Sequence, residues 1–129
     1  MGVLPVTEVA PARAAIYLQK AQQFQRSAEK MIGTGEEEAA GLLAIHAAIS
    51  ACDSLTVKHP GLRSTSPHHL DVLRLIERLP LGGKEEIKKQ LRALLSRKNV
   101  VEYGDRLLPR GDAGEMVKIA GRLVAAASR

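Results

Sequence analysis

A short polar segment, residues 97–106, holds the side chains of this 129-residue chain that are best suited to chemistry. Its candidates for ligand contact are Arg97, Lys98, Asn99, Tyr103 and Arg106, and Glu102 lies among them. A guanidinium binds phosphate through paired hydrogen bonds, a phenol can donate another beside it, and lysine adds positive charge. The residue types therefore favour an anion-binding surface, with Arg97, Glu102 and Tyr103 as the candidates for catalysis if any occurs.

The spacing of this segment places most of its side chains on one helix face. Asn99, Glu102, Tyr103 and Arg106 follow one another at i, i+3, i+4 and i+7. Arg97 lies about 140° around a regular helix from Glu102, so the two converge more easily across a two-fold axis than within one chain. The alternative is a solvated helix end whose cations complement the helix dipole.

A second group of candidates lies earlier in the chain. His46 and Asp53 are seven residues apart, on one face of a predicted helix. We expect them to contact the ligand-binding side chains rather than the ligand itself. A buried Asp53 would need a cationic partner, and Arg97 is the candidate. The alternative is a structural histidine and an exposed aspartate.

The sequence predicts no metal and no cofactor. His59, His68 and His69 flank a loop without acidic or cysteine partners at ligand spacing. The single cysteine, Cys52, lies on an apolar stripe and is expected to be a small core residue. The Gly82–Lys84 segment lacks the upstream glycine and strand of a phosphate-binding loop.

Helical periodicity accounts for nearly all the remaining sequence. Apolar residues recur every three or four positions in five segments, near residues 11–33, 37–58, 66–79, 84–103 and 112–126. No useful strand-like alternation is present. We expect one all-α domain over residues 1–129, an antiparallel four-helix bundle with an additional short helix, preceded by a flexible tail at 1–8.

Alanines in the second of these segments leave two interpretations open. Ala47, Ala48 and Ala51 lie partly off the apolar stripe of that helix. They predict either a second packed face that meets another subunit, or an exposed face rich in alanine.

Composition and charge narrow the classes of function. Aromatic residues make up 2% of the chain, which argues against a base-stacking surface. The net charge of +5 resides in residues 84–129, where 11 lysines and arginines face 6 acidic residues, and this asymmetry points weakly to a polyanion such as RNA. No apolar run approaches a membrane span and no secretory pattern begins the chain, so we expect a cytoplasmic protein with no membrane partner.

Two segments, Gly41–Leu55 and Leu94–Tyr103, together with the helix order, resemble the HEPN superfamily over roughly residues 10–128. The resemblance implies a bundle of four to five helices that forms homodimers. It also implies that many relatives are metal-independent endoribonucleases, often toxins paired with a small nucleotidyltransferase. In those relatives a motif arginine and histidine meet in the cleft between subunits, and Arg97 matches that arginine.

The chain departs from the family pattern at position 102. Glu102 stands where the motif histidine would fall, whereas Tyr103 matches the tyrosine of a variant motif. Cleavage through a cyclic phosphate needs a group that exchanges a proton near neutral pH, which histidine does best. We therefore expect a non-catalytic homodimer that binds nucleotide or RNA, or docks a nucleotidyltransferase-type partner. The alternative is a metal-independent endoribonuclease with its site at the dimer cleft.

Overall fold

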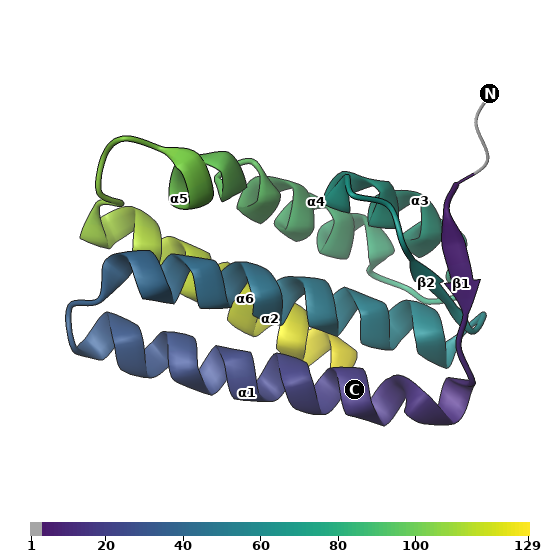
Figure 1. The fold of residues 1–129 in the computed structure, drawn as a ribbon. Coiled ribbons are helices and arrows are strands. Elements are labelled where there is room, and N and C mark those ends of the chain that lie inside the picture. Colours follow the sequence, from purple (N-terminus) through teal and green to yellow (C-terminus); the bar gives the residue numbers. More distant parts are fainter. Residues whose placement is uncertain (1–3) are drawn as a thin grey trace.

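The computed structural model describes residues 4–129, and most of them are helical (Figure 1). The helices are α1 (Ala14–Gly33), α2 (Glu37–Lys58), α3 (Val72–Ile76), α4 (Lys84–Leu95), α5 (Lys98–Tyr103) and α6 (Arg110–Ala127), with 3-10 turns at Pro11–Arg13 and His69–Asp71. The predicted all-α class is therefore confirmed.

Helix α2 is the centre of the bundle. It forms an antiparallel hairpin with α1 and packs along α6, while α4 lies against α6 on the side away from α1 (Figure 1). Successive long helices alternate in direction, so α2 and α6 run the same way and form the inner pair. The short helix α3 connects this bundle to α4, as the predicted additional helix.

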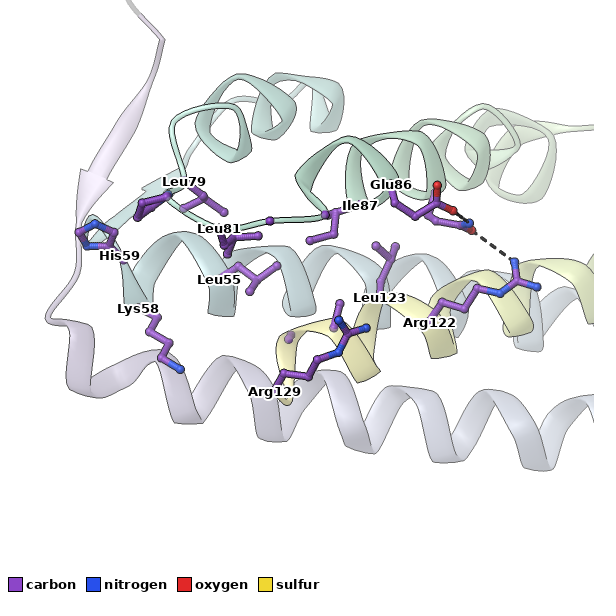
Figure 2. A pocket seen from close by; sticks show the side chains of 16 residues that line it. Leu55, Lys58, His59, Leu79, Leu81, Glu86, Ile87, Arg122, Leu123 and Arg129 are labelled. Carbon is purple, nitrogen blue, oxygen red and sulfur yellow. Dashed lines mark hydrogen bonds between the residues drawn. The ribbon is translucent and has the colours of Figure 1, made fainter.

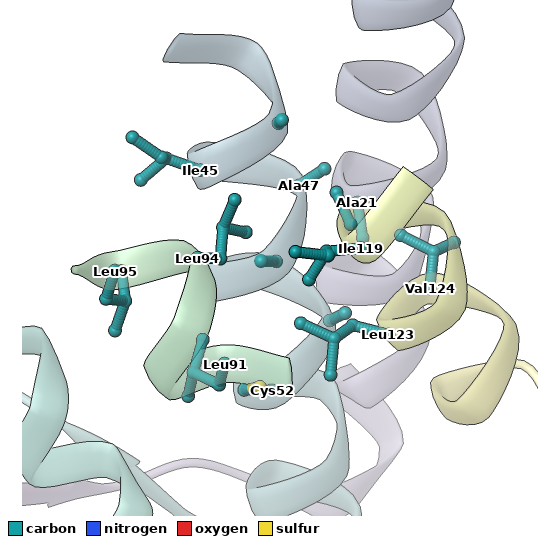
Figure 3. Close-up of a cluster of buried hydrophobic side chains, with 14 of the residues drawn as sticks. Ala21, Ile45, Ala47, Cys52, Leu91, Leu94, Leu95, Ile119, Leu123 and Val124 are labelled. Carbon is teal, nitrogen blue, oxygen red and sulfur yellow. The ribbon is translucent and has the colours of Figure 1, made fainter. Parts of the chain in front are cut away.

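Alanines allow the inner helices to approach closely. Ala21 on α1, Ala47 and Ala51 on α2 and Ala120 on α6 are completely buried. Figure 3 shows Ala21 and Ala47 beside Ile119, in the layer between α1, α2 and α6. The second alanine face of α2 is thus covered by helices of the same chain, and neither a second subunit nor solvent occupies it.

By length and composition alone, α2 is long and apolar enough to cross a membrane, the one such helix among residues 4–129. However, 72% of its most apolar stretch is buried inside the bundle, as expected for the core helix of a helical bundle.

A two-stranded antiparallel sheet replaces part of the predicted tail. Strand β1 (Val6–Glu8) pairs with β2 (Leu62–Ser64), with Thr7 opposite Arg63, and Leu4 just before it is buried. Residues 1–3 of the predicted tail lie outside the described residues. Strands of three residues are too short to show alternation, and their pairing joins distant parts of the chain, so no sequence pattern predicts them.

The packing of α2 makes Ala47 intolerant of larger side chains. We expect Ala47→Leu to lower the free energy of unfolding by about 1–3 kcal/mol, because the added carbons have no space between α1, α2 and α6. Ala93→Leu, at an exposed position of α4, should change it by less than about 0.5 kcal/mol. Urea unfolding followed by circular dichroism measures both, and equal effects would contradict this account.

Candidate functional site

The polar segment begins at a break between two helices. Helix α4 ends at Leu95, and Arg97 is the N-cap residue of α5. The Ser96 hydroxyl donates a hydrogen bond to the Ala93 carbonyl at 2.7 Å, an interaction that bends helices. The prediction of one helix over residues 84–103 is therefore wrong at this point, where a two-residue turn at Ser96 and Arg97 separates α4 from α5.

Helix α5 is seated on the N-terminal half of α2. A Cβ at Gly41 would lie 3.4 Å from Val101 Cγ2 and only 2.7 Å from Leu108 Cδ2. The Glu38 carboxylate also accepts a hydrogen bond from the Leu108 backbone amide. The missing side chain at Gly41 thus lets α5 and the connector after it pack directly on α2.

Lys98, Glu102 and Tyr103 form a local cluster on α5. Lys98 Nζ lies 2.9 Å from Glu102 Oε2 and 5.9 Å from the centroid of the Tyr103 ring. The hydrogen bond from Lys98 is the main cause that lowers the pKa of Glu102, with smaller contributions from Tyr103 and from the charge of His46. Glu102 is therefore a carboxylate at neutral pH.

The other candidates on this segment do not join that cluster. Nη1 of Arg97 is buried and has no hydrogen-bond partner within residues 4–129, while Tyr103 at the far end of α5 is 78% exposed. No recorded contact joins Arg97 to Tyr103 in this part of the chain. Asn99 is exposed on α5, and Arg106 follows Gly104, where the backbone becomes extended. The predicted shared face is therefore wrong for Arg106.

Asp53 pairs with Arg63, so the prediction that Arg97 is its cationic partner is wrong. Asp53 is 5% exposed, and its Oδ2 lies 3.1 Å from Nε of Arg63 on β2. The guanidinium of Arg63 also stacks on the Tyr17 ring, 5.5 Å from its centroid. Asp53 lies in the C-terminal half of α2, which faces β2, whereas α5 packs on the other half. Arg63 was missed because only the unpredicted strand brings it there.

His46 is separate from Asp53. It is exposed, and its ring lies 5.6 Å from the Phe24 ring on α1, tilted by 38°. Its charge acts on Glu102 rather than on Asp53, as the pKa of Glu102 shows. The expectation that the two residues act together behind one site is therefore wrong, because they lie in opposite halves of α2.

Cys52 occupies the core, as expected. It is completely buried, and burial raises the pKa of its thiol, with the neighbouring charge of Asp53 as a smaller cause. The thiol therefore stays protonated and unreactive. Across the described residues, no three side chains of His, Cys, Asp or Glu converge as metal ligands would.

These observations define an all-α bundle with a cluster of polar and charged side chains on α5, where it packs on the N-terminal half of α2. A family model described as "HEPN domain" matches residues 14–129, so the chain belongs to the HEPN family. A comparison with curated proteins finds no match to this chain.

The burial of Asp53 predicts a pH dependence of stability. Burial raises its pKa in the folded state more than Arg63 and Lys20 lower it. Its contribution to stability is therefore greatest below its unfolded pKa of about 3.9 and is lost as the pH rises through the folded pKa. We expect the unfolding free energy of the wild type, relative to Asp53→Asn, to fall between pH 4 and 7.

Urea unfolding at several pH values measures this difference. Arg63→Gln should make the total fall larger and extend it to higher pH, because it removes the larger of the two cationic influences that lower the pKa of Asp53. A difference that stays constant or increases with pH would contradict the assignment.

Proposed function

We propose that this HEPN domain binds a phosphate-bearing ligand, RNA or a nucleotide, on α5 without cleaving it. The observation that carries the proposal is the ion pair of Lys98 with Glu102, at the position where the family motif has histidine. A carboxylate held in its charged form cannot donate a proton at neutral pH. Since no imidazole stands at position 102, the acid–base partner expected in cleaving relatives is absent from the motif.

The charges around α5 favour an anion. Lys98 neutralises Glu102, so the carboxylate repels phosphate less than a free one would. Arg97 retains one buried donor without a partner, and Arg106 has no ion pair within residues 4–129. The exposed guanidinium of Arg106 suits bidentate contact with phosphate, whereas Nη1 of Arg97 is closed to solvent in the single chain.

We further propose that the domain is a homodimer with α5 at the interface. Large apolar or aromatic side chains are exposed here: Val100 is 48%, Tyr103 78% and Leu107 83% exposed. Three large exposed side chains within eight residues would together favour contact with a partner. A two-fold axis beside α5 would bring Arg97 of one copy toward Tyr103 of the other, which a single chain keeps apart.

RNA binding tests the ligand. We expect purified protein to bind fluorescently labelled single-stranded RNA in EDTA and to leave it intact. Lys98→Gln combined with Arg106→Gln should weaken binding about 10-fold, because the first leaves the Glu102 carboxylate uncompensated and the second removes a phosphate contact, which should reduce the slope of log affinity against log salt by about 0.7. Fluorescence anisotropy measures affinity, and denaturing gels measure cleavage.

The matched control, Arg74→Gln with Arg78→Gln, removes two exposed charges at and beside α3, at the opposite end of the bundle. It should change affinity less than twofold. Cleavage by the wild type that Arg97→Ala abolishes would replace the proposal with the endoribonuclease alternative. No RNA or nucleotide binding at all would overturn it and leave docking of a nucleotidyltransferase-type protein as the remaining role.

The dimer has its own test. We expect Leu107→Glu to convert the dimer to monomer, because it places a charge in the proposed interface. Leu70→Glu, at another exposed leucine (49%) far from α5, should leave the dimer intact. Sedimentation velocity distinguishes the species. A monomeric wild type, or equal effects of the two variants, would refute the interface.

A further inference from the structure

A cavity of about 610 Å³ lies between the C-terminal end of α2, the start of α4 and the last turns of α6 (Figure 2). Its apolar lining includes Leu55, Leu79, Leu81, Ile87 and Leu123. The volume falls within the range of small-molecule sites, which are mostly apolar with a few polar groups. The cavity therefore has the size and lining to hold one small molecule.

The rim of this cavity is positively charged. Lys58, Arg122 and Arg129 line it, and the one acidic side chain of the lining is Glu86. Glu86 Oε1 accepts a hydrogen bond from Gln90 Nε2 at 2.7 Å, while Gln90 Oε1 accepts a longer one from Arg122 Nη1 at 3.4 Å (Figure 2). No ion pair within residues 4–129 involves any of the three cations.

The apolar lining favours a ligand with an apolar body, and the charged rim favours a ligand with a negative head group. An apolar body gains free energy by removing the leucine and isoleucine surface from water. A negative head group gains from whichever of the three rim cations lies nearest to it, whereas a positive head group would be repelled and a neutral one would gain little. Since the lining carries three cationic side chains and one carboxylate, Glu86 does not cancel this preference.

We propose that the cavity binds an amphipathic anion, a small molecule with an apolar body and one carboxylate or phosphate head group. The site is separate from the surface on α5, which lies at the opposite end of α4 (Figure 1). The two proposals can therefore fail independently.

The test compares ligands that share one chain and differ in head group. We would titrate ¹⁵N-labelled protein with decanoate, decyl phosphate, decanol and decyltrimethylammonium, below the concentrations at which they form micelles, and follow amide shifts by NMR. We expect one or both anions to bind and to shift amides that line the cavity, Gly82 and Gly83 among them. Decanol should bind at least about 10-fold more weakly, and the cation should not bind.

Two variants assign binding to the cavity. Lys58→Gln with Arg122→Gln should weaken anion binding about 10-fold and leave decanol within about twofold. Arg26→Gln with Lys30→Gln, an equal loss of charge on exposed positions of α1, should have no effect. Ala126→Phe, which adds a ring to the lining, should abolish binding of all chains. Ala126→Leu replaces it if thermal melting shows that the phenylalanine variant is unfolded.

The comparison between decanoate and decyl phosphate decides the head group. Similar affinity for anions, alcohol and cation would overturn the charge preference. Shifts elsewhere in the chain, or binding that survives in the folded Ala126 variant, would overturn the site itself, as would no binding of either anion.

Discussion

The close contact of α2 with α1 and α6 is the constraint on which the rest of the structure depends. Fully buried alanines such as Ala21, Ala47 and Ala120 let the three helices approach one another, and any larger side chain would separate them. Because α2 is enclosed along its middle, neighbours can reach it mainly toward its two ends. Helix α5 occupies the N-terminal half, and β2 with the lining of the cavity occupies the C-terminal half.

This arrangement divides the positive charge of the chain between two surfaces. The excess resides in residues 84–129, but α4 and α6 carry it toward opposite ends of the bundle. Near α5, Lys98 is neutralised by Glu102, and Arg97 and Arg106 remain. Near the cavity, Arg122 donates a hydrogen bond to the amide oxygen of Gln90 and has no ion pair within residues 4–129. A charge count alone suggests one basic patch, whereas the fold makes two surfaces with different linings.

The sequence predicted the helices well because each buries a stripe of side chains every three or four residues, and burial is what periodicity reports. It failed where a local or distant interaction overrode that pattern. The hydroxyl of Ser96 breaks the fourth helix, and strand β2 delivers Arg63 to Asp53. The cavity could not be predicted from the sequence for another reason. Leu55, Ile87 and Leu123 fit the periodicity of core residues whether they contact other side chains or line a cavity.

The break before Arg97 changes how the motif must be interpreted. In one continuous helix, the angle between Arg97 and Glu102 would be fixed by helix geometry. The break lies before Arg97, whose carbonyl accepts a hydrogen bond from the Val101 amide, so that angle is still set within α5. What the break changes is the placement of α5, which depends on where Val101 and Leu108 rest against α2 and so on the absence of a side chain at Gly41. The position of the motif is therefore a property of tertiary packing. For this reason the identity of residue 102 can change the chemistry of the site while the HEPN fold that carries it stays the same.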